Sequence, residues 1–246
     1  MNTDHDTIVA PATAAGGAIA VIRISGGEAF AVCDRIFRGR RPLAEADGYT
    51  VHYGTIAEGD RVIDDVLAAV FRAPHSYTGE NSVEISCHGS SYIVSEILRL
   101  LIAAGGRMAQ PGEFTRRAFL NGRMDLTQAE AVADLLEAET AEQAANAAGQ
   151  LSGAIRARID PIYDTLTDIL AHFHAALDYP DEDIDPFSLE QYARTLERAW
   201  EDLTALLHTY GRGQVLRRGV AAVLLGRPNA GKSSLLNALA GFDRVI

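Results

Sequence analysis

The 246-residue sequence contains little lysine and cysteine, and it has no long apolar run. Lys232 is the single lysine among 22 basic residues. Cys33 and Cys87 form neither a CxxC pattern nor a cluster with histidine, which excludes a disulfide scaffold and a structural zinc site and predicts a reduced, cytoplasmic protein. No apolar run reaches the roughly 18 residues that a bilayer span needs, so we expect no membrane contact. Asp4 and Asp6 stand where a signal peptide would be basic.

Acidic residues outnumber basic residues by 33 to 22, which gives a net charge of −11. Such a chain binds nucleic acid poorly by itself, because affinity for the phosphate backbone comes from many Lys and Arg contacts. The balance changes along the chain: residues 1–120 hold 14 acidic and 11 basic side chains, residues 121–210 hold 18 and 5, and residues 211–246 hold 1 and 6. This pattern predicts at least two domains and a basic end, with a partner needed for any action on nucleic acid.

Residues 1–120 are expected to form a mixed α+β domain. Apolar runs and alternation predict strands at residues 18–24, 51–56, 66–71 and 82–88, of which the middle two form a hairpin around residues 58–61. Within residues 82–88, Cys87 falls on the apolar face and is expected to be a core residue. Helical spacing over residues 92–104 predicts a helix that ends at a Gly-Gly pair.

Residues 121–218 are expected to form an all-α helical bundle segment. Asp125 and Gln128 have the spacing of a capping box, and no turn signal follows until Gly149. Apolar residues then recur every three or four positions over residues 155–176, which is typical of a helix that packs on another helix. Pro161 lies inside this pattern, so either the helix kinks there or a new helix begins.

The rest of this segment predicts one more helix after an acidic linker. Residues 181–185 hold four acids in five positions, but they lack the glycine turn and the distant glutamate of a calcium loop, so a solvated linker is the favoured interpretation. Ser188 and Gln191 then form a second capping-box pattern, and the helix that follows is expected to end at Gly211.

Residues 219–246 carry the clearest chemical motif. An apolar run at residues 219–225 predicts a strand, residues 226–233 fit G-x-x-x-x-G-K-[ST], and residues 234–239 have helical character. In such a loop, glycines let backbone N–H groups surround phosphate oxygens, and the helix N-terminus adds positive potential. Lys232 is expected to neutralise the β- and γ-phosphates, and the Ser233 hydroxyl to bind magnesium. This segment therefore predicts the first strand–loop–helix unit of a P-loop α/β domain. Residues 226–241 are similar to the phosphate loops of Era-like GTPases, and this resemblance implies a P-loop α/β GTPase domain.

Several segments, in the same order along the chain, resemble the MnmE (TrmE) family of tRNA-modifying GTPases. They are residues 6–10 (DTIVA), 22–26 (IRISG), 77–80 (YTGE), 111–121 (PGEFTRRAFLN), 125–131 (DLTQAEA), 180–182 (PDE) and 226–241 (GRPNAGKSSLLNALAG). The resemblance spans nearly the whole chain, and the PGEFTRRAFLN segment together with the phosphate loop is its most specific part.

The resemblance implies three domains: a folate-binding and dimerisation domain (1–120), the first part of a helical domain (121–218) and the start of an Era-like G domain (219–246). It implies an enzyme that hydrolyses GTP with Mg²⁺ and K⁺. The family works as a homodimer with a flavoprotein of the MnmG/GidA family, which carries FAD. Together they add an aminomethyl or carboxymethylaminomethyl group at position 5 of the wobble uridine of tRNA, and a tetrahydrofolate derivative (5-formyl or methylene form) supplies the one-carbon unit.

The resemblance also implies site residues. Arg23, Glu80 and Arg123 match the family's folate contacts; a carboxylate suits the amino-pyrimidine edge of a pterin, and arginine suits carboxylates. The nucleotide loop comprises Asn229, Ala230, Gly231, Lys232, Ser233 and Ser234. Within it, Asn229 is implied to bind potassium and Ser233 to bind magnesium. No catalytic acid or base is assigned, since the histidines show no partnered spacing: His75, His88, His172, His174 and His208.

Two departures from the family pattern affect the functional expectation. The usual His-Gly-Gly run is replaced by His-Gly-Ser-Ser at residues 88–91. The sequence also stops at Ile246, before the switch, aspartate-glycine and guanine-reading motifs, so we expect a truncated form that does not hydrolyse GTP productively by itself. The alternative function is a folate-binding dimerisation module whose phosphate loop is inert.

Overall fold

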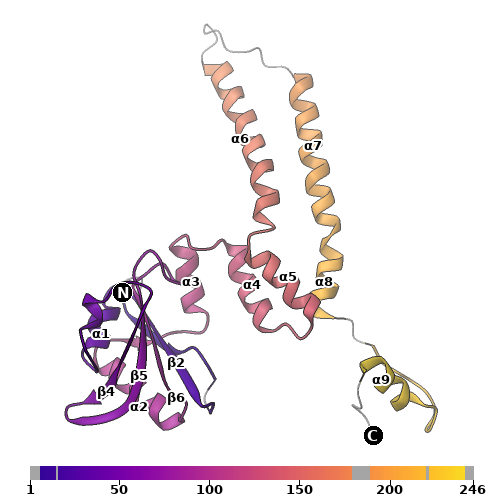
Figure 1. The fold of residues 1–246 in the computed structure, drawn as a ribbon. Helices are drawn as coiled ribbons and strands as arrows, with labels where there is room; N and C mark the ends of the chain where they lie inside the picture. The colour runs from indigo at the N-terminus through magenta and orange to yellow at the C-terminus, as the bar shows by residue number, and fades with distance from the viewer. Residues whose placement is uncertain (1–5, 15, 179–188, 220–221, 242–246) are drawn as a thin grey trace. The chain divides into compact units, whose positions relative to one another are not determined.

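The computed structural model describes residues 6–14, 16–178, 189–219 and 222–241 (Figure 1). The chain divides into two compact units, residues 1–136 with 148–156 and residues 137–147 with 157–246. In chain order the elements are β1 (Ile8–Pro11), β2 (Ile19–Ser25), α1 (Ala29–Asp34), β3 (Phe37–Gly39), the 3₁₀ turn η2 (Leu43–Glu45), β4 (Thr50–Glu58), β5 (Arg61–Phe71), β6 (Ser82–His88), α2 (Ser91–Ala103), β7 (Arg107–Met108), α3 (Glu113–Leu120), α4 (Leu126–Leu136), α5 (Ala141–Leu151), α6 (Arg156–Asp178), α7 (Leu189–His208), α8 (Tyr210–Arg218) and α9 (Lys232–Ala240). The predicted order of a mixed α+β part followed by helices is confirmed.

The first unit is built on a seven-stranded sheet with the strand order β3-β4-β5-β6-β2-β1-β7. Neighbouring strands are antiparallel except β1 and β7, which are parallel. The predicted hairpin is formed by β4 and β5, which are longer than expected and turn at residues 59–60. Strand β6 has the predicted bounds, and β2 lies one residue later than predicted.

The core of this unit lies on one face of the sheet. Every second residue of β2 and β6 is buried there, α1 packs against β6, and α2 packs against both strands. The fully buried side chains include Ile22, Ile24, Val66, Val70, Val83, Ile85, Ile97 and Leu101. Cys33 and Cys87 are free, buried thiols within this core, and burial raises the pKa of Cys87 to about 11. Cys87 is therefore a core residue, as its position in the strand predicts.

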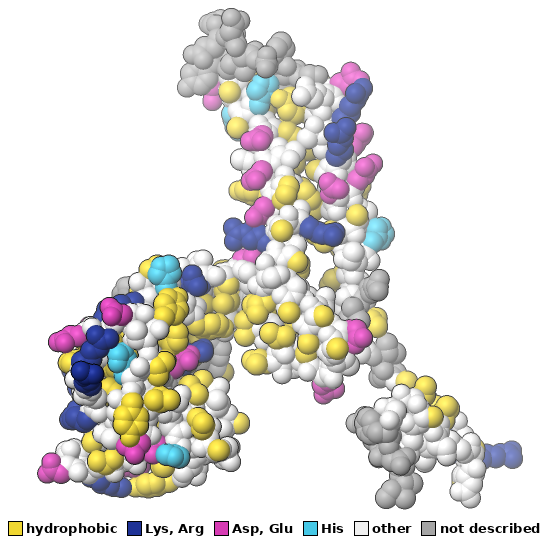
Figure 2. Space-filling model, in the orientation of Figure 1, with side chains coloured by type: hydrophobic (Ala, Val, Ile, Leu, Met, Phe, Trp, Pro, Cys, Tyr) yellow, Lys and Arg dark blue, Asp and Glu magenta, His cyan; other side chains and the backbone are white. Residues whose placement is uncertain are grey.

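The opposite face of β4 and β5 is exposed over part of its length. Val51 on β4 is 63% exposed, Tyr53 is 67% exposed, and Leu67, the register partner of Tyr53 on β5, is 47% exposed. Figure 2 shows hydrophobic side chains at the surface of this unit. The alternation of strand side chains thus produces an apolar core on one face and apolar surface side chains on the other.

The predicted capping box starts α4. The Gln128 backbone N–H donates to Asp125 Oδ1, and the Asp125 N–H donates to Gln128 Oε1, both at 2.9 Å. The hydrogen bond from the Thr127 hydroxyl has the largest effect on the pKa of Asp125. Together with the bond from the Gln128 N–H it lowers this pKa, although burial acts in the opposite direction. These bonds satisfy N–H groups that a helix start leaves unpaired, which is why this sequence pattern located the helix correctly.

The expectation of an uninterrupted helix up to Gly149 is wrong, because α4 ends at residue 136 and α5 begins at residue 141. The structure contains a second capping box, which the sequence reasoning missed. The Gln143 N–H donates to Thr140 Oγ1 and the Thr140 N–H donates to Gln143 Oε1, both at 3.1 Å. Reciprocal side-chain bonds replace the backbone bonds that a continuous helix would make there.

Helices α6 and α7 run side by side (Figure 1), and Tyr192 of α7 is hydrogen bonded to His172 Nδ1 of α6. Helix α6 continues through Pro161, so the alternative that a new helix begins at this proline is wrong. The Ser188 cap and the acidic linker lie outside the described residues.

The predicted helix end at Gly211 is also wrong. Helix α7 ends at residue 208, and Gly211 lies inside α8. Gly211 is not among the glycines with positive φ, and the glycine that follows the last residue of α8 is Gly219 (φ +66°), in a backbone conformation that glycine adopts readily.

At the C-terminal end, the predicted helix at residues 234–239 is confirmed within α9. The predicted strand at residues 219–225 is not formed over its described residues 222–225, where Val223 is 78% and Leu225 89% exposed. A strand requires a neighbouring strand to pair its backbone groups, and none of the described strands pairs with this run. No helix in the described ranges has the apolar length that crossing a bilayer requires.

The two faces of the sheet should respond differently to substitution. We expect Ile85→Ala, at a fully buried position, to lower the free energy of unfolding of the first unit by about 2–5 kcal/mol, because it leaves a cavity in the core. Leu67→Ala, at an exposed position, should cost less than about 1 kcal/mol. Urea-induced unfolding followed by far-ultraviolet circular dichroism measures both, and equal losses would contradict this description of the core.

Candidate functional site

Arg23 lies on the partly exposed face of β2, opposite Glu84 of β6 in the strand register. Its Nε and Nη2 atoms are each 2.8 Å from Glu84 Oε1. The guanidinium also lies over two aromatic rings, 4.9 Å from the ring centre of Tyr77 and 5.7 Å from that of Phe114. Arg23 is thus a strand residue held by an ion pair and by cation–π contacts with Tyr77, in the loop that precedes β6, and Phe114, on α3.

Arg123 contacts the same loop, which joins β5 to β6, from the segment that follows α3. Its Nε donates to the carbonyl oxygen of Ser76 at 3.1 Å, and the Nδ2 of Asn121 donates to Thr78 O at 2.7 Å. Gly79 has φ +80°, and a Cβ there would lie only 3.1 Å from the side chains of Arg123 and Asn121. Glycine therefore lets the segment after α3 approach the loop closely.

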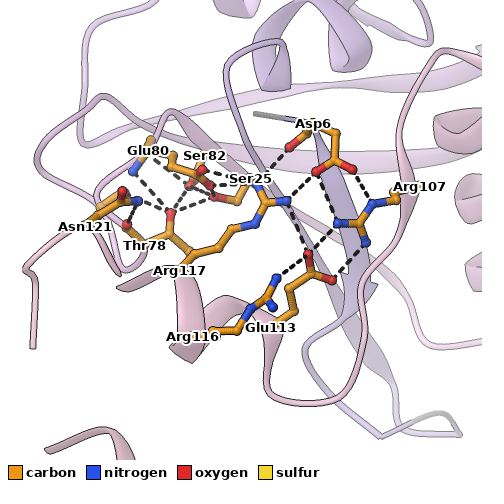
Figure 3. Close-up of polar contacts among 11 residues, drawn as sticks. Asp6, Ser25, Thr78, Glu80, Ser82, Arg107, Glu113, Arg116, Arg117 and Asn121 are labelled. Carbon is orange, nitrogen blue, oxygen red and sulfur yellow. Dashed lines mark hydrogen bonds and ion pairs between the residues drawn. The ribbon is translucent and has the colours of Figure 1, made fainter. Parts of the chain in front are cut away.

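Glu80 follows this glycine and has both carboxylate oxygens hydrogen bonded (Figure 3). The Ser25 hydroxyl donates to Oε2 at 2.8 Å, and Arg117 Nη1 donates to Oε1 at 3.1 Å. Ser25 belongs to a buried hydroxyl cluster with Thr78, at 2.6 Å, and Ser82, at 3.1 Å. Glu80 is consequently a carboxylate in a fixed orientation, with 16% of its side chain exposed.

Arg117 belongs to a charge network that the sequence reasoning did not identify as part of the site (Figure 3). Its Nη1 donates to the Asp6 carbonyl oxygen at 2.8 Å, and its Nη2 contacts the Asp6 carboxylate and Glu113 Oε1. Arg107 binds the same two carboxylates from β7. The local signals of this network are the spacings on α3 of Glu113 from Arg116, three residues, and from Arg117, four residues.

The network shifts the ionisation of its carboxylates. Hydrogen bonds from Arg107, which outweigh desolvation, lower the pKa of Glu113 to about 2. Burial alone would raise the pKa of Asp6, but the hydrogen bonds from Arg107 and Arg117 are stronger in sum and hold this pKa below its ordinary value. Both carboxylates are therefore ionised at neutral pH, which arginine at hydrogen-bonding distance favours.

Arg23, Glu80 and Arg123 all contact or belong to the loop of residues 76–80, so the fold brings the three predicted folate residues to one region. Glu80 presents a carboxylate that accepts N–H groups, and the exposed Arg123 presents N–H groups that suit an acidic ligand. This donor and acceptor set fits a pterin with an acidic tail. The individual roles of the three residues stay predictions.

The phosphate loop has a conformation that suits an anion. Asn229 (φ +61°) and Gly231 (φ +79°) turn the backbone so that α9 begins at Lys232. Lys232 Nζ donates to the carbonyl oxygens of Gly226, at 3.1 Å, and Arg227, at 2.8 Å, which holds the amine over the loop. The N-terminus of α9 and this amine form a set of donors for phosphate. Ser233, the predicted magnesium ligand, is exposed in the first turn of α9.

His88, like His172, has a partner that its sequence spacing did not reveal. Asp64 of β5 accepts hydrogen bonds from His88 Nδ1 at 2.6 Å and from the His88 backbone N–H at 2.8 Å. The two residues lie near the end of β6 opposite to Ser82 and Glu80. This pair therefore belongs to the framework of the sheet and is separate from the loop around Glu80.

Two family models match almost the whole chain. The model described as the N-terminus of the GTP-binding protein TrmE matches residues 7–123, and that of the MnmE helical domain matches residues 126–243. The chain belongs to the MnmE family. Curated relatives named tRNA modification GTPase MnmE include those of Bacteroides thetaiotaomicron, 45% identical over 99% of this chain and 53% of the relative, and Symbiobacterium thermophilum, 47% identical over 98% and 54%. A third, from Carboxydothermus hydrogenoformans, is 43% identical over 98% and 54%.

The chain spans about half the length of the curated MnmE relatives it matches. The boundary expected between residues 120 and 121 lies close to the end of the first match, whereas the boundary expected between residues 218 and 219 falls inside the second. The domain limits of this MnmE family member stay predictions.

The charge network should make the first unit sensitive to acid. Because the pKa of Glu113 is about 2 in the folded protein and ordinarily 4.5, its stabilisation is complete above about pH 4.5 and is lost as the pH falls towards 2. The loss is on the order of 3 kcal/mol. We expect Glu113→Gln to be less stable at neutral pH and to show a flatter dependence across this window, measured by urea unfolding at several pH values. Glu28→Gln, at an exposed carboxylate without a side-chain capping bond, should keep the wild-type slope.

Proposed function

We propose that this chain is part of a GTP-hydrolysing tRNA modification enzyme. With a flavoprotein of the MnmG/GidA family, which carries FAD, it would add an aminomethyl or carboxymethylaminomethyl group at position 5 of the wobble uridine, using a one-carbon unit from a 5-formyl or methylene tetrahydrofolate. The relatives named tRNA modification GTPase MnmE support this assignment. The observation that supports it most directly is the oriented Glu80 carboxylate in a loop that Arg23 and Arg123 also contact.

In the proposed folate site, Glu80 accepts N–H groups of the amino-pyrimidine edge, while Arg23 and Arg123 face the acidic parts of the ligand. The folate supplies the one-carbon unit when it is bound. Arg23 already has Glu84 as an ion-pair partner, so it adds little net charge, and the more exposed Arg123 is the better candidate for the acidic tail. The protein residues therefore bind and orient the ligand.

In the proposed nucleotide site, residues 229–234 surround the phosphates of GTP. Lys232, whose amine lies on the carbonyl oxygens of Gly226 and Arg227, would neutralise the phosphates, Ser233 would hold Mg²⁺ through its hydroxyl, and Asn229 would hold K⁺ through its side-chain oxygen. The left-handed conformations at Asn229 and Gly231 support this assignment, because such backbone turns are typical of loops that present N–H groups to an anion.

The proposed partners follow from charge and surface. A net charge of −11 favours tRNA binding through the complex with the flavoprotein rather than through this chain alone. We also propose a homodimer formed by the first unit, supported by the exposed apolar side chains of β4 and β5. The two free thiols are consistent with the proposed cytoplasmic location.

A folate-binding module with an inert phosphate loop is the second candidate. It is favoured by one observation, the absence of strand pairing at residues 222–225 among the described strands, because a P-loop is ordinarily fixed by a strand that precedes it. In that case the chain binds folate but no nucleotide.

Separate titrations with 5-formyl-tetrahydrofolate and a fluorescent GTP analogue distinguish the two functions. For the enzyme, we expect both ligands to bind. Glu80→Gln should weaken folate binding about tenfold or more, because it removes a charged acceptor, and should leave nucleotide binding unchanged. Lys232→Met should weaken nucleotide binding and leave folate binding unchanged, since it removes the only lysine amine. Each variant is the control for the other, and folate binding without any nucleotide binding would favour the module.

The proposed dimer is tested by changing one face of the sheet unit at a time. Leu67→Asp places a charge on the exposed face of β5 and should shift the chain towards a monomer in analytical ultracentrifugation. Ile102→Asp, at a similarly exposed position (43%) on α2, should leave the dimer intact. If both variants dimerise as the wild type does, the face formed by β4 and β5 is not the interface.

A further inference from the structure

Glu80 is held from its buried side by two donors. Ser25 Oγ donates to Oε2 at 2.8 Å, and Arg117 Nη1 lies 3.1 Å from Oε1 and 3.3 Å from Oε2. An ionised carboxylate has about four acceptor positions, so these bonds leave acceptor capacity for a ligand. The orientation of the carboxylate is consequently determined by the protein before a ligand arrives.

Arg117 is itself fixed on several sides. Its side chain is 5% exposed, and it bonds to the carbonyl oxygen and carboxylate of Asp6 and to Glu113, which is 1% exposed. Gly26, at the end of β2, permits this arrangement, because a Cβ at this position would lie 2.7 Å from the Asp6 carbonyl oxygen. The guanidinium is therefore presented to Glu80 in one geometry, which the planar fork of arginine suits and a lysine amine does not reproduce.

The charges of the network favour a ligand at Glu80. The three carboxylates of the network share their arginines unevenly: Arg116 lies 3.9 Å from Glu113, and the two arginines at the centre of the network are Arg107 and Arg117. Asp6 and Glu113 each bind both arginines, whereas the arginine contact of Glu80 in the described part of the chain is Arg117. Glu80 is thus the member of the group with the least compensation by arginine, and a ligand with N–H donors completes it.

We propose that Arg117, fixed by Asp6 and Glu113 and assisted by Ser25, is a positioning residue that orients Glu80 for the amino-pyrimidine edge of the folate. This inference rests on the proposed folate function of Glu80. Arg117 acts through Glu80 and has no contact of its own with the ligand. Its contribution to folate binding therefore depends on the carboxylate being present.

A double-mutant cycle tests this dependence. The dissociation constant of 5-formyl-tetrahydrofolate is measured by isothermal titration calorimetry for the wild-type chain, Glu80→Gln, Arg117→Lys and the double variant. We expect Arg117→Lys to weaken binding about tenfold, and the double variant to bind within about twofold of Glu80→Gln alone. A general structural role of Arg117 would instead give multiplicative losses, and this result, or unchanged affinity in Arg117→Lys, overturns the proposal.

Two further variants control for loss of stability. Ile97→Ala, at a fully buried position on α2 outside the charge network, lowers the stability of the first unit by leaving a cavity, and it should keep folate affinity within about twofold of wild type even if it melts at a lower temperature. Ser25→Ala removes one hydrogen bond to Glu80 without unpairing a buried charge, and it should weaken binding about three- to tenfold.

The outcomes separate this proposal from the proposed function. If Glu80→Gln weakens binding but Arg117→Lys does not, the folate site stands and the positioning role of Arg117 is wrong. If Arg117→Lys does not fold, the same double-mutant cycle of folate binding is measured with Ser25→Ala and Glu80→Gln, and this cycle tests the proposal. If the wild-type chain does not bind the folate at all, both proposals are wrong.

Discussion

The ion pairs of Arg117 connect the parts of the first unit that carry the candidate site. They join the N-terminal segment at Asp6, the loop at Glu80 and the first turn of α3 at Glu113. Asp6 lies 111 residues and Glu80 lies 37 residues from Arg117 in the sequence. A buried arginine is stable only when its charge is balanced and its N–H groups are bonded. The same requirement therefore stabilises the unit and fixes the position of the loop between β5 and β6.

The sheet and most helices could be predicted because their signals are local. Alternating apolar residues identified β6, and the reciprocal spacing of Asp125 and Gln128 identified the start of α4. The break before α5 was missed, although Thr140 and Gln143 have the same spacing, because Ala- and Glu-rich sequence surrounds them and favours a continuous helix. Gly211 was misassigned because a glycine does not show in sequence whether it adopts a left-handed conformation.

The candidate site could be predicted only in part. Arg23, Glu80 and Arg123 came from the family resemblance, and their common position at one loop is visible only in the fold. The network behind Glu80 escaped sequence reasoning because its bonds are long-range: Arg107 and Arg117 lie 101 and 111 residues from Asp6. The strand expected at residues 219–225 had a suitable composition, but pairing is a property of two segments and cannot be inferred from one.

Lys232 has a consequence for chemical labelling. Its side chain is the only lysine amine in the sequence, and it lies at the surface of the phosphate loop, with its Nζ on two backbone carbonyl oxygens. Reagents that acylate amines therefore have a single side-chain target in this chain, apart from the α-amino group. Mass spectrometry of the adduct at this one position would report whether an anion covers the loop, with no need to engineer a probe into the protein.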